Sequence, residues 1–206
     1  MPAQPVIRVW SDYVCPFCYV ATERAAWLER TYGAQVEWLP FDLHPEYPPE
    51  GITIEELHAR YPAGLHEQVD RMIDEAGLPR GERRFVPNSR AALNVTELAR
   101  DKGVHEELHA RLMSAYWADG RDIGKPDVLV EEAEAVGLDP DEVRAVIAEL
   151  PYAERIAAAT AALYELGGGG VPGWVIDDRV FVPGAQPHEL FERVMQKLGH
   201  GGESAP

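Results

Sequence analysis

The amino-acid sequence predicts an α/β fold that carries a large all-helical insertion. A β-branched run at residues 6–10, an amphipathic stretch that begins at Pro16 and an alternating run at residues 36–41 predict a strand, a helix and a strand in succession. Such a unit with short connections gives parallel strands joined by a right-handed crossover. The pattern is then helical throughout residues 53–166, before a hairpin and a closing helix.

The length and composition fit one domain that carries an insertion. The chain has 206 residues, of which 46% are hydrophobic and 26% are charged, as in ordinary globular proteins. We expect residues 1–50 and 168–206 to form the α/β unit, and residues 51–167 to form the helical insertion.

Charge and hydropathy exclude two classes of partner. The formal net charge of −16 has the same sign as a phosphate backbone, so nucleic acid is not expected to bind. A membrane is not expected as a partner either, because no apolar run approaches the roughly 20 residues of a membrane span. Residues 1–5 contain no basic side chain and do not resemble a secretory signal, which predicts a cytoplasmic protein.

The ends of the expected helices carry capping residues. Gly33 is expected to end the first helix in the left-handed conformation, and Thr53 with Glu56 forms a capping box. The tail from Gly199 is expected to be disordered. The helices of the insertion and the closing helix are expected to begin near Thr53, Leu65, Ser89, Glu106, Pro126, Pro140, Ala153 and Pro187.

The two cysteines of the chain lie three positions apart at the start of the first expected helix. Residues at this spacing share one helix face, within the distance that a disulfide requires. Pro16 suits the first turn, so Cys15 lies where unpaired N–H groups and the helix dipole favour an anion. Cysteines in this position commonly have a pKa lowered from about 8.5 to about 3.5–7.5. We predict that Cys15 is a nucleophilic thiolate and that Cys18 is a more buried resolving thiol.

A metal site is an alternative role for two cysteines at this spacing. A structural zinc ion needs four ligands, so histidines would have to complete the set. His105 and His109 are four positions apart, but we interpret them as one face of a surface helix. No metal is therefore expected, and an isolated Cys-x-x-Cys pair in a reducing compartment favours catalysis.

A hairpin preceded by proline is the second informative stretch. Within residues 171–182, two short strands flank a two-residue turn, either Asp177-Asp178 or Asp178-Arg179. Pro172 stands at the entry to the first strand, and the peptide bond before a proline can be cis at a small cost in free energy. Glycines 167–170 are interpreted as a helix stop, because no strand precedes them and no Lys-Ser/Thr follows, as a phosphate-binding loop requires.

Four local motifs resemble one protein family. They are Ser11–Tyr19 with its Cys-Pro-Phe-Cys core, Phe41–Pro45, Gly170–Pro172 and Gly184–Pro187. Together with the order of the elements, they resemble the DsbA family of thiol–disulfide oxidoreductases. The likeness is greatest to the FrnE-like branch, which is similar to 2-hydroxychromene-2-carboxylate isomerases and kappa-class glutathione transferases. The resemblance implies a thioredoxin-like fold with a helical insertion.

The resemblance also implies roles for individual residues. Cys15 corresponds to the exposed nucleophile, Cys18 to its resolving partner, and Pro172 to a cis-proline that faces the thiols. The backbone of Val171 corresponds to a segment that pairs with an extended substrate peptide. The expected substrate-binding residues are therefore Pro16, Phe17, Val171 and Pro172.

The leading hypothesis is a disulfide oxidoreductase or isomerase that acts on protein or small-molecule thiols. The Cys15 thiolate attacks a disulfide, a mixed disulfide forms, and Cys18 displaces the product. Phe17 replaces the basic or Trp residue often found between the cysteines and offers the thiolate neither charge nor proton. We therefore predict a reduction potential more negative than about −120 mV, which is the value of the most oxidising DsbA-type proteins. Gly173 stands where a bulkier residue is common, which alters the expected substrate groove.

Two other functions stay open. A glutathione-dependent isomerase or transferase would activate glutathione, as a co-substrate, at residue 15, with a small aromatic substrate between the core and the insertion. Retention of Cys18 argues against this chemistry, which needs no resolving thiol, and no other cofactor is expected. The third function is a binding module with idle cysteines.

Several further side chains have both a functional and a structural interpretation. Asp12 is a candidate for proton transfer near Cys15, although an Asp just before a helix is more often a cap. Asp42 and His44 follow the second strand, where they would line the site or hydrogen-bond the loop. Most of the aromatic residues near the site are expected in the core, namely Trp10, Tyr13, Tyr19, Trp38 and Trp174.

Overall fold

A four-stranded mixed sheet forms the centre of the α/β unit. The computed structural model describes residues 4–62 and 64–201. β2 is parallel to β1, whereas β5 is antiparallel to β1 and to β6, which confirms the predicted strand–helix–strand unit and hairpin. In the spatial order β2-β1-β5-β6, the strands are Gln35–Pro40, Val6–Ser11, Gly173–Ile176 and Val180–Pro183.

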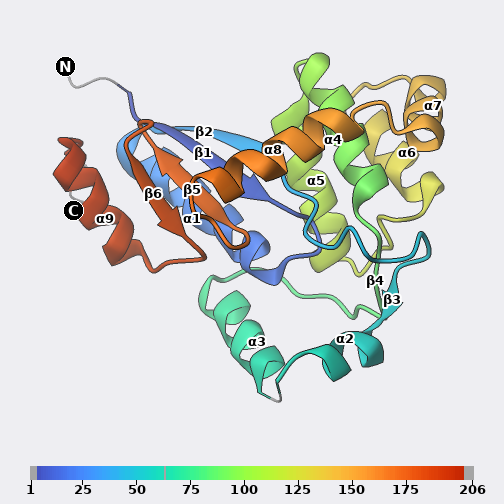
Figure 1. Cartoon of the computed structure of the whole chain (residues 1–206), viewed down its shortest axis with the longest axis horizontal. Coiled ribbons are helices and arrows are strands. Elements are labelled where there is room, and N and C mark those ends of the chain that lie inside the picture. The colour runs from blue at the N-terminus through green and yellow to red at the C-terminus, as the bar shows by residue number, and fades with distance from the viewer. Residues whose placement is uncertain (1–3, 63, 202–206) are drawn as a thin grey trace.

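Helices cover both faces of this sheet (Figure 1). Side chains alternate across the strands, so Val9 and Trp174 lie on one face, while Trp10 and Val175 lie on the other. The first face packs against α1 and α9, and the second face packs against Leu163 of α8. The three helices are α1 (Pro16–Tyr32), α8 (Ala153–Glu165) and α9 (His188–Leu198).

Close packing of α8 explains the glycine that follows Pro172. A Cβ atom on Gly173 would lie 2.5 Å from Cδ1 of Leu163, a side chain that is fully buried. A larger residue would therefore displace Leu163 and separate α8 from β5. Gly173, which stands where a bulkier residue is common, therefore permits the close contact between α8 and β5.

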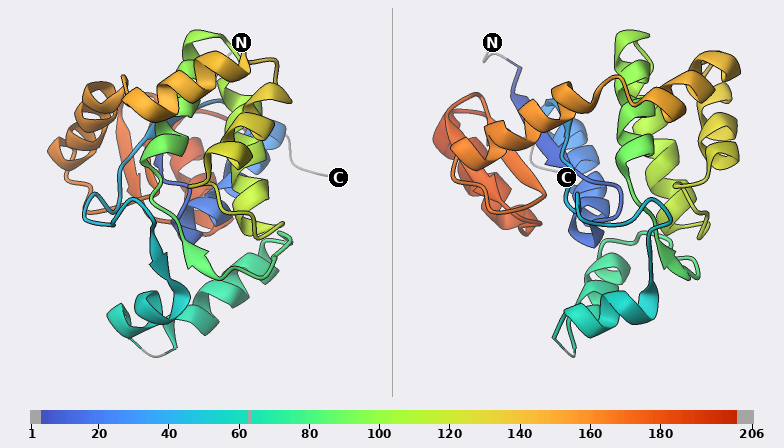
Figure 2. Two further views of the ribbon diagram at one scale, coloured as in Figure 1. Left: turned by 90° about the vertical axis from the view of Figure 1, so that its right-hand side faces the viewer. Right: turned by 45° about the vertical axis from the view of Figure 1, so that its right-hand side comes forward.

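The other helices form the insertion between β2 and β5. Four of them surround one large core, whereas α2 and α3 project from it as a helical pair (Figures 1 and 2). Eight residues of α4 are buried, against two of α3 and none of α2. The core helices are α4 (Arg90–Asp101), α5 (His105–Trp117), α6 (Pro126–Glu134) and α7 (Pro140–Glu149), and the projecting pair is α2 (Ile54–Arg60) and α3 (Leu65–Glu75).

The structure agrees with the α/β class and its helical insertion, while the boundary residues between the two parts stay a prediction.

Within the described ranges, no helix combines the length and the apolar character that spanning a membrane requires.

Most helix and turn signals of the sequence are confirmed. Gly33 ends α1 with φ of 62°, and Thr53 with Glu56 forms both hydrogen bonds of a capping box at α2. Asp177 and Asp178 both have positive φ, which identifies them as the two residues of the hairpin turn.

Three expectations are wrong. The insertion is not entirely helical, because β3 (Ile52–Thr53) pairs antiparallel with β4 (Phe85–Val86). His109 does not lie on a surface face of α5, since its imidazole is buried and stacks on Trp38 at 4.3 Å between centroids. His200, expected in a disordered tail, is buried and bonds Asp177. The rest of that tail, residues 202–206, lies outside the described residues.

Candidate active site

The two cysteines lie at the N-terminus of α1, as the sequence predicts. Cys15 is the N-cap residue, with φ −82° and ψ 118°, and Pro16 occupies the first turn. The Cys15 carbonyl accepts hydrogen bonds from the N–H groups of Cys18 (3.1 Å) and Tyr19 (3.2 Å), which closes this turn. Both thiols are free. The turn therefore holds two reduced sulfurs on one side of the helix.

The surroundings of the two thiols differ. Cys15 lines a cavity of about 410 Å³, and its Sγ donates to the carbonyl oxygen of Val171 at 3.5 Å. Cys15 is only 3% exposed, so it is not the exposed residue that the resemblance implied, and Cys18 is 0% exposed and does not line the cavity. Burial raises the pKa of the Cys18 thiol well above its usual value, and the neighbouring Cys15 raises it further. This arrangement suits an attacking thiol at the cavity and a resolving thiol behind it.

The loop before β5 forms the cavity wall next to Cys15. The Val171–Pro172 peptide bond is cis. Gly170 and Val171 line the cavity, whereas Pro172 is buried and its carbonyl accepts from the N–H of Gly184 at 2.7 Å. Of the residues expected to bind substrate, Pro16, Phe17 and Val171 line the cavity, and Pro172 does not.

Asp12 is fully buried and joins three segments. Its carboxyl accepts hydrogen bonds from the N–H of Val14 (3.2 Å), the N–H of Leu43 (2.8 Å) and the hydroxyl of Ser89 (3.0 Å). Burial raises its pKa from 3.8 to about 6, although the hydrogen bonds oppose this shift. Asp12 is not the N-cap of α1, because Cys15 has that position. A carboxyl with this pKa can exchange a proton near neutral pH.

The loop after β2 contributes to the cavity through His44 but not through Asp42. His44 lines the cavity and stacks on Tyr47, with ring centroids 4.2 Å apart. Asp42 instead pairs with Arg90, with Nε and Oδ2 separated by 3.1 Å. Only one member of the pair singled out in the sequence is therefore placed to meet a ligand.

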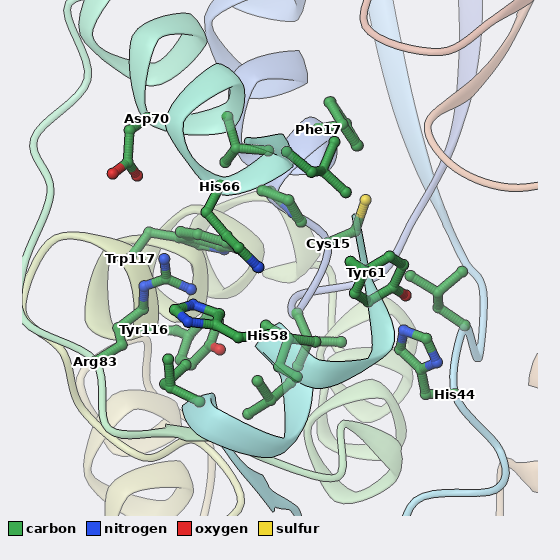
Figure 3. A pocket seen from close by; sticks show the side chains of 18 of the residues that line it. Cys15, Phe17, His44, His58, Tyr61, His66, Asp70, Arg83, Tyr116 and Trp117 are labelled. Atoms are coloured by element: carbon green, nitrogen blue, oxygen red, sulfur yellow. The ribbon is translucent and has the colours of Figure 1, made fainter. Parts of the chain in front are cut away.

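The helical insertion supplies many of the other residues that line the cavity, which the sequence did not reveal. His58, Tyr61, His66, Arg83 and Trp117 line the cavity and are shown as sticks in Figure 3. They come from α2, α3, α5 and the connecting loops, so no spacing along the chain brings them together. The one available signal was a histidine within the apolar face of α3, because His66 is three and seven positions before Val69 and Ile73.

Aromatic side chains support the cavity from the core. Trp117 stacks on Tyr19 at 5.4 Å between centroids, and its indole N–H donates to the carbonyl of Tyr13 at 2.8 Å. Tyr13 and Tyr19 are buried, as expected from the sequence. Helix α5 is therefore tied directly to the segment that carries the cysteines.

Comparison with known proteins agrees with this architecture. Residues 6–196 match the family described as DSBA-like thioredoxin domain. The uncharacterized protein YwbO of Bacillus subtilis is 29% identical over 194 residues, which cover 92% of this chain and 94% of that protein. The crystal structure of a probable DsbA oxidoreductase from Streptomyces coelicolor is 29% identical and superposes with a TM-score of 0.85, covering 98% of this chain and 92% of that one.

More distant structures share the fold alone. A 2-hydroxychromene-2-carboxylate isomerase has a TM-score of 0.70 at 19% identity, covering 94% of this chain and 96% of that one. The cytosolic disulfide reductase DsbM from Pseudomonas aeruginosa, solved with GSH, has a TM-score of 0.69 at 20% identity, covering 94% of this chain and 99% of that one.

Proposed function

Because the chain belongs to the family of DSBA-like thioredoxin domains, we propose that it is a thiol–disulfide oxidoreductase acting through Cys15 and Cys18. The observation that carries this proposal is the asymmetry of the two thiols. Both are free and one helical turn apart, but only Cys15 lines the cavity. A substrate in the cavity meets Cys15 first, and Cys18 is held where it can attack Cys15 afterwards.

The proposed reaction conserves electrons in two exchanges. The Cys15 thiolate attacks one sulfur of a substrate disulfide, so that the substrate S–S bond breaks and one half leaves as a thiol after protonation. The Cys18 thiolate then attacks Cys15, releases the second half, and leaves a Cys15–Cys18 disulfide. A dithiol donor restores the reduced pair, and the reverse sequence oxidises a substrate dithiol.

The second exchange requires a proton acceptor, because the Cys18 thiol holds its proton tightly. Burial raises the pKa of this thiol, so its thiolate is scarce at neutral pH. Asp12 precedes the Cys-x-x-Cys turn, is fully buried and has a pKa of about 6. We propose Asp12 as the candidate for proton transfer near Cys15, because it lies in the loop that leads to Cys15 and its pKa is close to neutral pH.

Phe17 supports a moderate reduction potential. Its phenyl ring lines the cavity beside Cys15 and brings neither charge nor a hydrogen-bond donor to the sulfur. We expect a potential more negative than about −120 mV, the value of a strongly oxidising DsbA. Equilibration with glutathione buffers measures it, and a value near −120 mV would contradict the assignment to Phe17.

The cavity also favours a second candidate, a glutathione-dependent isomerase or transferase acting on a small aromatic substrate. Its volume of about 410 Å³ lies in the range of small-molecule sites, and its walls are largely apolar and aromatic. In that chemistry Cys15 would activate glutathione and Cys18 would be dispensable. The buried Cys18 behind Cys15 favours the dithiol mechanism.

Reduction of insulin disulfides with dithiothreitol as donor tests the proposal. The wild type should accelerate insulin reduction and Cys15→Ser should not. Cys18→Ser separates the candidates, because a dithiol enzyme stalls as a mixed disulfide, whereas an isomerase continues. Insulin reduction that is indifferent to Cys15→Ser would dismiss the mechanism and leave a binding module.

A further inference from the structure

Arg83 lies in the cavity without an acidic partner. Arg80 and Arg84 on either side pair with Asp70 at 2.8 Å and Glu82 at 3.4 Å. No carboxylate of the described residues lies within 4.0 Å of the Arg83 nitrogens. In a chain with 35 acidic and 19 basic side chains, a partly buried cation without an ion pair is an exception.

Aromatic rings hold Arg83 in place instead of a carboxylate. The guanidinium carbon lies 3.8 Å from the ring centroid of Trp117 and 5.4 Å from that of Tyr116. Stacking on an aromatic face fixes the plane of a guanidinium while leaving its edge free to donate hydrogen bonds. Arg83 is therefore a fixed cation whose charge is not neutralised by this part of the chain.

Two buried nitrogens of the cavity wall lack hydrogen-bond partners among the described residues. They are Nε of Arg83 and Nε2 of His66. The His66 ring lies 3.8 Å from that of His58, and burial together with His58 lowers the pKa of His66. Buried polar groups are rarely left unpaired, so two such nitrogens on one cavity point to an acceptor that binds there.

The remainder of the cavity suits a carbon skeleton. In Figure 3, Cys15 and Arg83 lie on opposite sides of the cavity, with His58 and His66 between them. The one carboxylate on the wall, Asp70, is already paired with Arg80. The apolar part of the wall includes Leu43, Ile54, Leu57, Leu65, Val69 and Val86.

We propose that this cavity binds a low-molecular-mass disulfide or thiol that carries a carboxylate. The sulfur lies at Cys15, the carbon chain follows the apolar wall, and the carboxylate accepts hydrogen bonds from Arg83 and His66. The volume of about 410 Å³ fits a small molecule. The inference rests on the proposed function and specifies the substrate class of the same site.

The reaction with such a disulfide is balanced. The Cys15 thiolate attacks the nearer sulfur, the S–S bond of the ligand breaks, and the distal half leaves as a thiol after protonation by water. The retained half stays on Cys15 with its carboxylate at Arg83. Cys18 then releases it as a second thiol and forms the internal disulfide.

The test measures how fast the Cys18→Ser variant forms a mixed disulfide. Dithiodibutyrate is compared with the uncharged bis(hydroxybutyl) disulfide of the same length, and the adduct is followed by mass spectrometry. The diacid should react at least about tenfold faster, because a charge-assisted hydrogen bond is lost in the diol. Arg83→Met should reduce this preference to about one, and Arg83→Lys should leave a smaller preference.

Arg84→Met is the matched control, because it removes a neighbouring exposed charge outside the cavity. It should retain the preference for the diacid. An equal loss in both variants would assign the preference to the general field of the protein and overturn the proposal. Equal rates for the two disulfides in the parent variant would overturn it as well.

Three further outcomes distinguish a failure of the proposed function, a failure of the substrate class and a different kind of ligand. If neither disulfide forms an adduct, the proposed function fails and the substrate class fails with it. If the diol reacts but the diacid has no advantage, the proposed function stands and only the substrate class is wrong. If an acidic peptide disulfide outcompetes the diacid in an Arg83-dependent way, the site recognises a protein side chain instead.

Discussion

The cavity beside Cys15 has two walls that are built differently. The first consists of the start of α1 and the end of α5, where Cys15, Tyr116 and Trp117 are at most 3% exposed. The second consists of α2 and α3, which have no buried residue and two buried residues, respectively, and project from the rest of the molecule (Figure 2). Dense packing holds a reacting sulfur in place, whereas thin packing permits local opening. We infer that the first wall supports the chemistry and the second governs access and substrate choice.

The largest effect is expected from the reacting sulfur of the first wall. Cys15→Ser should lower the rate of disulfide reduction by at least about a thousandfold, because a serine hydroxyl is a far weaker nucleophile than a thiolate. Steady-state reduction of insulin or of a small disulfide measures this loss. If Cys15→Ser retained more than a tenth of the activity, the chemistry would not occur at the first wall.

A difference in stability between the two walls is the next largest effect. Leu112 of α5 is fully buried, so Leu112→Ala should lower the free energy of unfolding by about 3 kcal/mol. Leu57 of α2 is only half-buried, and Leu57→Ala should cost less than about 1 kcal/mol. Urea denaturation measures both changes, and equal losses would remove the contrast between the walls.

Asp12 is expected to make a pH-dependent contribution to the free energy of unfolding, of a size similar to or smaller than the effect of Leu112→Ala. Its folded pKa of about 6 lies above its usual 3.8, so the folded state binds the proton more tightly. Its contribution to stability is therefore fully present below pH 3.8 and is lost as the pH rises through about 6, by at most about 3 kcal/mol. Unfolding of wild type and Asp12→Asn between pH 4 and 7 measures it. The stability of wild type relative to the variant should fall with pH, and a difference that is constant or rises would contradict this.

The smallest effect is expected from the cap of α2. Thr53→Ala removes the capping box and should lower the free energy of unfolding by about 1 kcal/mol. The loss should be confined to the second wall. It should raise KM for a small disulfide more than it lowers kcat. Asp139→Ala at the start of α7 is the control, because it removes a cap of similar strength away from the cavity. Equal changes in KM for both variants would contradict a role of α2 in access.

The same contrast explains what the sequence made predictable. The first wall depends on local signals: Pro16 after Cys15, Gly33 at the end of α1, and a Cys-x-x-Cys spacing that has meaning within one helical turn. These features depend on residues a few positions apart, so they are visible in the chain. The α/β class was predictable for the same reason, because each strand and helix has a periodicity that is visible within a few residues.

The second wall depends on distant contacts, which leave no pattern in the sequence. The β3–β4 pair is only two residues long on each side and joins segments more than 30 positions apart, too short for any periodicity to appear. Arg83 lies two positions before β4, so this pairing brings Arg83 back towards the helices that carry His58 and His66. His109 was misplaced for a related reason, since its burial depends on Trp38 from a different element.

Mapping the site of disulfide capture tests the central claim most directly, namely that the cavity presents one sulfur of the pair and withholds the other. Cys18→Ser and Cys15→Ser are each mixed with the same small disulfide under folded conditions, and the adduct is located by peptide mass spectrometry. We expect rapid capture on Cys15 in the first variant and no capture on the fully buried Cys18 in the second. Capture on Cys18 at a comparable rate, while that variant is still folded, would contradict it.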